Sequence, residues 1–181
     1  MRVISGEYRG TKLDAPEGLS TRPTIDRVKE GIFSSIGFQV PGARVLDLFA
    51  GSGQMGIESL SRGAKSCTFI DRDRKAVAVI NGNIKRCGIK DGVKVYNTTA
   101  EAFLGRNREH FDIVFLDPPY SNEILEKIIP AVYDILEDNG IIIAESELGW
   151  SLKKEISGLV EIKKYKYGKV QVTKFQKESA E

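Results

Sequence analysis

From residue 43 onward, short hydrophobic runs typical of strands alternate with longer stretches whose hydrophobic residues recur at helical spacing. The strand-like runs cover residues 44–49, 66–71, 93–97, 111–117 and 140–145. The helix-like stretches cover residues 55–61, 74–87, 100–104 and 122–136. This alternation predicts a parallel sheet with helices on both faces, joined by right-handed crossovers. The runs at 111–116 and 141–144 are hydrophobic almost throughout, as central strands buried on both faces are.

The beginning of the chain departs from this alternation. Residues 2–5 and 10–13 are partly hydrophobic runs on either side of a glycine-containing turn, which predicts a small β-hairpin. Thr24 suits the N-cap of a helix, because hydrophobic residues follow it at helical spacing. These residues are Ile25, Val28, Ile32, Phe33 and Ile36. We therefore expect an N-terminal extension of hairpin and helix over residues 1–40.

The end of the chain departs from it as well. Residues 159–167 and 169–175 are strand-like and meet at Gly168, which predicts an antiparallel hairpin that closes one edge of the sheet. With the five earlier strands, this hairpin makes a seven-stranded, mostly parallel sheet. We assign residues 41–181 to this α/β domain.

The composition narrows the functional class. The 181 residues suit one domain, and no hydrophobic run approaches the roughly 18–20 residues of a membrane helix. The first residues also lack the hydrophobic stretch of a secretory signal. Two cysteines, Cys67 and Cys87, are too few for a disulfide scaffold, and a single histidine, His110, argues against a metal centre. We expect a cytoplasmic monomer without a bound metal.

The net charge of +2 hides an asymmetry. Residues 1–44 carry 7 basic and 5 acidic side chains, residues 45–150 carry 12 and 16, and residues 151–181 carry 8 and 4. An acidic middle between basic ends suits binding of a polyanion. The alternative is that the lysines of the last segment only form a solvated face.

A glycine-rich loop follows the first strand of the domain. Residues 51–56 read G-x-G-x-x-G between a strand and a helix, where backbone N–H groups and the helix N-terminus approach a ligand. Asp71 ends the second strand 20 residues after Gly51 and is placed to accept hydrogen bonds from a ribose. The pattern suits dinucleotide enzymes and S-adenosylmethionine enzymes alike.

Asp47 separates these two classes. It lies in the strand that enters the loop, where a pyrophosphate already brings negative charge in dinucleotide enzymes. S-adenosylmethionine has no phosphate but carries an ammonium and a sulfonium, which a carboxylate attracts. The loop therefore indicates S-adenosylmethionine, with a turn-capping role for Asp47 as the structural alternative.

The strand at 111–116 ends in an acid, two prolines and an aromatic residue: Asp117, Pro118, Pro119 and Tyr120. The prolines stiffen the backbone and remove N–H donors, which leaves the Asp117 carboxylate and the Pro118 carbonyl as acceptors. Such a site suits a substrate that donates two hydrogens, such as the exocyclic amine of a nucleobase. Tyr120 is placed to stack on that base once the nucleotide has left its helical stack.

These features together resemble the RsmD-type methyltransferases. The resemblance rests on Asp117–Tyr120, the loop at 47–53, the Ser-Arg-Gly-Ala segment at 61–64, the N-terminal segments 2–6 and 22–30, and Tyr167-Gly168. It implies a Rossmann-like class I S-adenosylmethionine-dependent methyltransferase that methylates guanine N2 in 16S ribosomal RNA. Its substrate is then 16S rRNA or a small-subunit assembly particle. Because a chain of this size offers little surface for recognising a sequence, we expect ribosomal proteins to complete the recognition surface.

The resemblance also implies site residues. Catalytic contacts are expected at Asp117, Pro118, Pro119 and Tyr120, and cofactor contacts at Thr24, Asp47, Phe49, Gly51, Gly53, Asp71, Arg72 and Glu101. RNA contacts are expected at Arg2, Arg9, Arg22, Arg27 and Lys29, with Arg22 also near the methionine end of the cofactor. One departure concerns the cofactor adenine, because Thr99 stands where family members often carry an acid, so that Glu101 or a backbone carbonyl takes its place.

Three other functions remain open from the sequence. The same chemistry serves DNA adenine-N6 or cytosine-N4 methylation, although a chain this short has no large target-recognition domain. A nicotinamide oxidoreductase conflicts with Asp47. A non-catalytic RNA-binding assembly factor with a vestigial cofactor pocket is the third.

Overall fold

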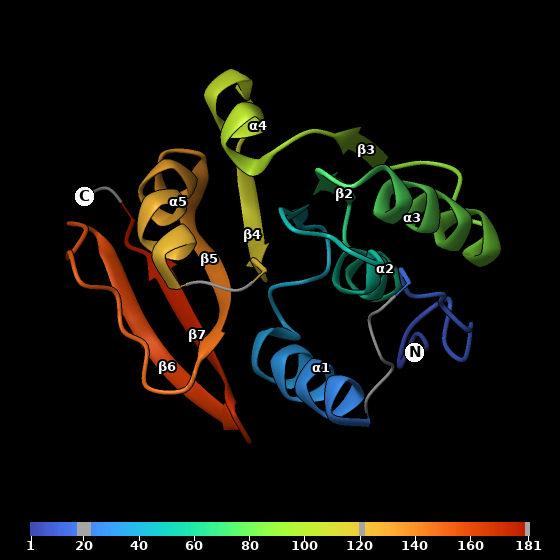
Figure 1. The fold of residues 1–181 in the computed structure, drawn as a ribbon, viewed down its shortest axis with the longest axis horizontal. Coiled ribbons are helices and arrows are strands. Elements are labelled where there is room, and N and C mark those ends of the chain that lie inside the picture. Colours follow the sequence, from blue (N-terminus) through green and yellow to red (C-terminus); the bar gives the residue numbers. More distant parts are fainter. Residues whose placement is uncertain (18–22, 120–121, 180–181) are drawn as a thin grey trace.

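A computed structural model describes residues 1–17, 23–119 and 122–179 of the chain (Figure 1). Within this part, one sheet has the strand order β3-β2-β1-β4-β5-β7-β6. The strands are β1 (Arg44–Asp47), β2 (Ser66–Asp71), β3 (Val93–Asn97), β4 (Phe111–Leu116), β5 (Leu136–Glu147), β6 (Leu159–Tyr167) and β7 (Val170–Lys177). The helices are α1 (Pro23–Ile36), α2 (Gln54–Ser61), α3 (Arg74–Cys87), α4 (Ala100–Arg106) and α5 (Asn122–Asp134).

The strand directions confirm the expected fold. β3, β2, β1, β4 and β5 pair in parallel, and β7 and β6 add an antiparallel hairpin at the β5 edge. The chain winds outward through β1, β2 and β3 and then returns to place β4 beside β1. The switch point between β1 and β4 is where ligands of such sheets bind, outside the carboxyl ends of the strands.

Two hydrophobic layers sandwich the sheet. One contains residues of α1, α2 and α3, and the other contains residues of α4 and α5. Side chains alternate between the faces along each strand, so that Phe115 belongs to the first layer and Leu116 to the second. Figure 1 shows α1 beyond the carboxyl end of β4, between α2 and the β6–β7 hairpin.

The N-terminal segment packs into the first layer. A single antiparallel bridge, Arg2 with Lys12, marks the expected hairpin, and Val3 N donates to Thr11 O at 3.0 Å. Val3 and Leu13 are buried in the same core as α1. The N-terminal extension therefore shares the core of the sheet domain.

The start of β5 differs from the sequence-based expectation. The strand begins at Leu136, which pairs with Phe111, whereas the hydrophobic pattern placed its start at Gly140. Between these positions Asn139 adopts a φ of 62° and the register with β4 shifts. The residues directly after Leu136 are polar, so the hydrophobic pattern does not show that the strand has already begun. Only the pairing of Leu136 with Phe111 of β4 defines its start.

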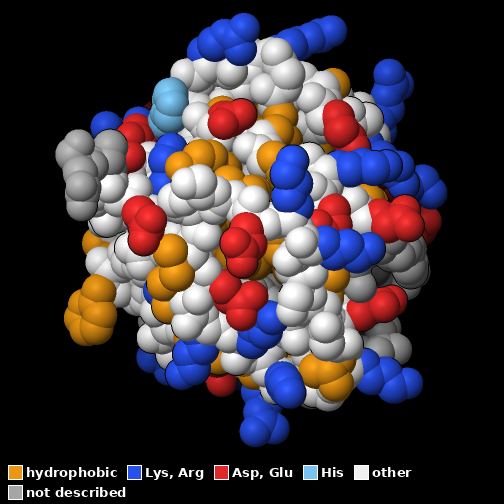
Figure 2. Space-filling model, turned by 90° about the vertical axis from the view of Figure 1, so that its left-hand side faces the viewer, with side chains coloured by type: hydrophobic (Ala, Val, Ile, Leu, Met, Phe, Trp, Pro, Cys, Tyr) orange, Lys and Arg blue, Asp and Glu red, His pale blue; other side chains and the backbone are white. Residues whose placement is uncertain are grey.

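The face formed by α5 and the β6–β7 hairpin carries both signs of charge. Figure 2 views this side, and its basic and acidic side chains are interspersed. Lys164 pairs with Glu161 at 3.1 Å, and Lys177 donates to Leu136 O at 2.8 Å. These two C-terminal lysines thus contact other parts of the protein, and both polyanion binding and a solvated face remain predictions for the other lysines of this segment.

Among the described residues, no helix combines the length and the hydrophobicity needed to cross a membrane.

Candidate active site

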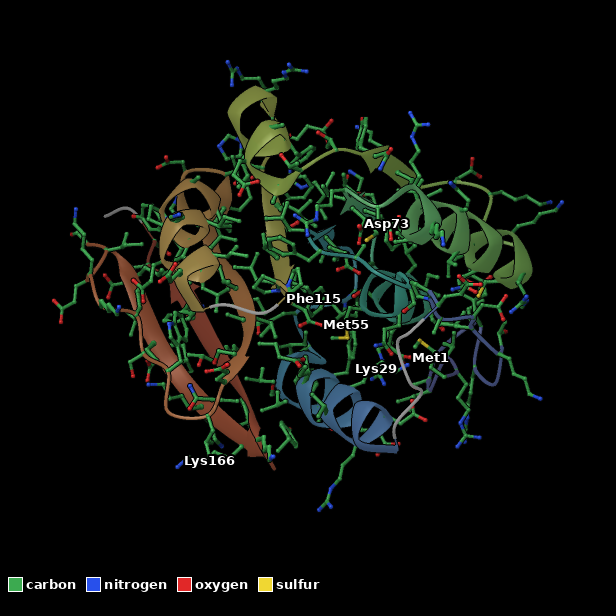
Figure 3. All side chains as sticks on the ribbon, viewed as in Figure 1. Met1, Lys29, Met55, Asp73, Phe115 and Lys166 are labelled. Carbon is green, nitrogen blue, oxygen red and sulfur yellow. The ribbon has the colours of Figure 1, made fainter. Side chains whose placement is uncertain are left out.

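The carboxyl ends of three neighbouring strands bring acidic residues together. Asp47 ends β1 and pairs in register with Phe115 of β4, so that Asp117 follows two residues further on. Leu116 pairs with Ala144, so Asp117 directly follows the end of β4 beside Glu145 of β5. Asp47 and Glu145 lie at strand positions of the face that α1 covers. Figure 3 shows Phe115 of this face beside Met55 at the start of α2.

The glycine loop adopts the geometry that its sequence requires. Gly51 and Gly53 have φ values of 55° and 75°, in the left-handed region that favours glycine. Gly53 is the N-cap of α2 and offers no side chain to it. Instead, Asp47 Oδ2 accepts the N–H of Gly56 at 3.1 Å. One oxygen of Asp47 therefore has the turn-capping role that was the structural alternative.

Asp71 connects the same loop to the second strand. Its Oδ2 accepts the N–H of Gly51 at 2.9 Å, and its Oδ1 accepts the N–H of Asp73 at 2.8 Å. Gly56 contributes close packing, since an added Cβ would overlap the Phe69 ring and Cys67 Sγ. The two acids expected to hold a cofactor thus also fix the loop that would surround it.

Burial and neighbouring acids raise the pKa values of the carboxyl groups at this edge. Burial raises the pKa of Asp47 to about 7; the Gly56 N–H opposes this rise, while the charges of Asp117 and Asp71 add to it. Asp117 stays accessible to solvent, yet enough protein surrounds it for desolvation to raise its pKa. Burial and the charge of Asp117 raise the pKa of Glu145. Carboxyl groups of this kind attract a positively charged ligand and accept a proton more readily than an ordinary carboxylate does.

Sequence reasoning missed three residues of this region. Glu145 had a signal, since it directly follows the hydrophobic run 141–144 as Asp117 follows its own. Gln54 Oε1 and Asp26 Oδ1 are buried acceptors without a hydrogen-bond partner within the described chain. Gln54 is the first residue of α2, directly after Gly53, whereas Asp26 lies in the first turn of α1. An unsatisfied buried acceptor next to the glycine loop, as Gln54 Oε1 is, suits a ligand that brings N–H donors.

Several expected contacts lie at the rim or outside the described residues. Tyr120 and Arg22 fall outside them, and the side chain of Thr24, within α1, is likewise not described. Pro118 is half-buried, Pro119, Arg72 and Glu101 are exposed, and half-buried Phe49 packs on the α5 side of the sheet. Thr99 Oγ1 accepts the N–H of Ala102 at 3.2 Å as the cap of α4.

The expected RNA contacts require one correction. Arg2, Arg9 and Arg27 are exposed, as phosphate contacts must be. Lys29 is only 1% exposed, and its ammonium donates to Arg2 O at 2.6 Å. Figure 3 shows Lys29 between α1 and the N-terminal segment that contains Met1. The prediction for Lys29 is wrong, because its charge is buried inside the fold.

The part of the chain that the structure describes contains no group of three or more histidine, cysteine, aspartate or glutamate side chains arranged to hold a metal.

Comparison with known proteins finds similarity over nearly the whole length of the chain. The family model "Conserved hypothetical protein 95" matches residues 1–176. The Bacillus subtilis protein named "Putative rRNA methyltransferase YlbH" is 42% identical over 182 residues, which cover 98% of this chain and 99% of the relative. "Ribosomal RNA small subunit methyltransferase D" of Escherichia coli is 37% identical, over 91% of this chain and 89% of its own. The solved structure of "Putative methyltransferase yhhF" from Escherichia coli has a TM-score of 0.90 at 32% identity, over 99% of both chains. The likeness thus includes the N-terminal extension.

Proposed function

We propose that this chain, which belongs to the conserved hypothetical protein 95 family of RsmD-type methyltransferases, methylates the exocyclic N2 amine of a guanine in small-subunit ribosomal RNA. Membership of this family makes it an S-adenosylmethionine-dependent methyltransferase. The observation that carries the proposal is the edge where Asp47 and Asp117 lie on neighbouring strands beside the glycine loop.

The residues of this edge fit S-adenosylmethionine. Its ammonium and sulfonium would compensate the carboxyl group of Asp47, which is buried at the end of β1. The unpartnered Gln54 Oε1, directly after the glycine loop, suits the donors of an ammonium. Asp71, at the end of β2, suits the ribose hydroxyls, although its two oxygens already accept backbone N–H groups. When bound, the cofactor supplies an electrophilic methyl group on a sulfonium.

Asp117 and Pro118 would orient the base. The Asp117 carboxylate accepts one N2 hydrogen and the Pro118 carbonyl accepts the other. These bonds favour a pyramidal nitrogen, whose lone pair is no longer delocalised into the ring. Placing the reacting nitrogen and its hydrogens in this way supplies most of the rate enhancement by proximity and orientation.

Asp117 would also remove the proton that the reaction releases. When the amine nitrogen takes the methyl group, the S–C bond would break and the cofactor would leave as a neutral thioether. The nitrogen then carries the positive charge, and one of its protons passes to Asp117 Oδ. Desolvation has already raised the pKa of Asp117 toward neutrality, which makes it a better proton acceptor than an ordinary aspartate. No histidine is required for this step.

The direct test is to map the methylated nucleotide. The purified chain is incubated with labelled S-adenosylmethionine and either naked 16S rRNA or immature small-subunit particles, and the digested RNA is analysed by mass spectrometry. We expect one guanine methylated at N2. Label on adenine N6, on DNA or on protein overturns the substrate, and no transfer to any of them favours the RNA-binding assembly factor.

The same reaction tests whether ribosomal proteins take part in substrate recognition. A small chain offers limited surface for recognising a sequence, so we expect faster transfer to particles that carry ribosomal proteins than to naked RNA. Equal rates would remove the need for protein partners.

A further inference from the structure

A hollow lies away from the edge that holds Asp47 and Asp117. It measures about 470 Å³ and is lined by β2, β3, α4 and the segment that follows α4. We call it the β3–α4 groove, and the lining residues that matter here are Thr68, Lys94, Tyr96, Phe103, Arg106 and Arg108. Its volume falls within the roughly 300–1,000 Å³ of typical ligand sites.

The groove exists because helices cover this face of the sheet unevenly. Val93 and Val95 pack toward α3, so the alternating residues Lys94 and Tyr96 face the opposite side. On that side α5 packs against β5, and α4 spans only seven residues. The outer strands β2 and β3 are therefore left partly open there.

The groove is separate from the proposed cofactor site. Lys94 lies near the amino end of β3, and Glu109 precedes β4, so the hollow extends toward the edge opposite to Asp47 and Asp117. At the carboxyl end of β3, the Asn97 side chain donates to the carbonyl oxygens of Asp71 and Arg72 at 3.1 and 3.0 Å. The expected cofactor contacts, such as Asp71 and Glu101, are not among the residues that line the groove.

The chemistry of the groove combines an aromatic surface with positive charge. Tyr96 is 43% exposed, and its ring centroid lies 5.9 Å from that of Phe103. Lys94 and Glu109 form an ion pair at 2.5 Å, so their charges cancel. Arg106 and Arg108 are exposed and leave the groove with a net positive charge.

Few groups in the groove remain to recognise a base by its edge. The Asn107 amide donates to Glu109 O at 2.6 Å and accepts the Glu109 N–H at 3.2 Å. Asn97 is engaged as described above. A stacking surface with nearby guanidinium groups and occupied amides is typical of single-stranded nucleic acid binding without sequence preference.

We propose that the β3–α4 groove binds an unpaired nucleotide of the substrate RNA at a distance from the target guanine, with its base on Tyr96 and its phosphates on Arg106 and Arg108. This inference rests on the proposed function, because it takes the substrate to be RNA. It gives the protein a second point of contact with that RNA.

Matched variants test the groove. Arg106→Ala/Arg108→Ala removes two charges from it, and Tyr96→Ala removes the stacking surface. The control, Lys85→Ala/Lys90→Ala, removes two exposed charges at and just after the end of α3. All are surface changes, and urea unfolding checks that each variant keeps its stability. The measurements are the Kd for 16S rRNA over a range of salt concentrations, the KM for RNA, kcat at saturating RNA and the Kd for S-adenosylmethionine.

We expect the double arginine variant to bind RNA about tenfold more weakly and to lower the salt slope of log K by about two, one for each phosphate contact. Tyr96→Ala should weaken binding at least about fivefold. kcat and the Kd for S-adenosylmethionine should match the wild type, and so should every property of the lysine control.

Two outcomes overturn the proposal. Groove variants that bind RNA as tightly as the lysine control show that the groove does not contact RNA, even if the wild type methylates it. A weakened Kd for S-adenosylmethionine in Tyr96→Ala assigns the groove to the cofactor instead. Failure of the proposed function is separate, since it is seen as absent methyl transfer by the wild type, and RNA binding by the variants can still be compared in that case.

Discussion

The ammonium of Lys29 lies 3.6 Å from the carboxylate of Glu58, and the two side chains are 1% and 0% exposed. Glu58 also accepts the N–H groups of Ile4 and Ser5 at 2.8 and 3.0 Å, while Lys29 donates to Arg2 O. This buried pair fastens the N-terminal segment to α1 and α2. The segment that carries the exposed arginines Arg2 and Arg9 is thereby fixed beside the glycine loop's helix.

Breaking this pair should destabilise the protein. Glu58→Gln leaves the Lys29 charge buried with a neutral partner, which costs about 3–5 kcal/mol in comparable cases. Urea unfolding at pH 7 measures the change. The control is Glu30→Gln, an exposed neighbour on α1, for which we expect a change within about 0.5 kcal/mol. Equal effects of the two substitutions would mean that the pair has no special role.

Asp47 should make stability depend on pH. Its pKa is raised from 3.8 to about 7 in the folded chain, so the stability present below pH 4 is lost as the pH rises toward 7. Asp47→Asn removes this loss. At pH 8 its free energy of unfolding should therefore exceed that of the wild type by about 2–4 kcal/mol. The difference should vanish near pH 4. In the same variant, S-adenosylmethionine should bind more weakly. A pH-independent difference between the two chains would contradict burial as the cause.

Gly56 should not tolerate a side chain. Gly56→Ala places a Cβ in the Phe69 ring, and overpacking of this kind costs about 1–3 kcal/mol. Gly82→Ala is the control, because Gly82 lies within α3 with no atom near the added Cβ. It should stabilise the helix by roughly 0.5–1 kcal/mol. Thermal unfolding compares both with the wild type, and destabilisation by both would point to a general loss of helix stability.

Asp117 should be needed for methyl transfer and not for cofactor binding. Asp117→Asn keeps the shape but loses the proton acceptor, so the single-turnover rate should fall about 10²–10⁴-fold. Asp91→Asn, an exposed aspartate before β3, is the control and should react at the wild-type rate. Calorimetry should give the same Kd for S-adenosylmethionine in all three chains. A fully active Asp117→Asn would remove Asp117 from the mechanism.

Much of the fold is visible in local sequence patterns. The bounds of β2, β3, α3 and β6 follow directly from periodicity and turn residues, because each element there has a regular hydrophobic pattern and a clear end. The acids after the strands are also local features. Once the alternation predicts a parallel sheet, its carboxyl edge collects Asp47 and Asp117 without further information.

Pairing and burial are decided only in three dimensions. Lys29 lies four residues after Ile25 and four before Phe33, on the hydrophobic stripe of α1, yet only the position of Glu58 inside the fold lets its charge be buried there. β5 starts at Leu136 because Phe111 pairs with it. The β3–α4 groove depends on a short α4 lying over two outer strands. The sequence by itself thus determined most of the elements and the acidic residues at the carboxyl edge, since these depend on residues close together in the chain. The tertiary structure decided which charges are buried and where a face stays open, since those depend on residues brought together from distant parts of it.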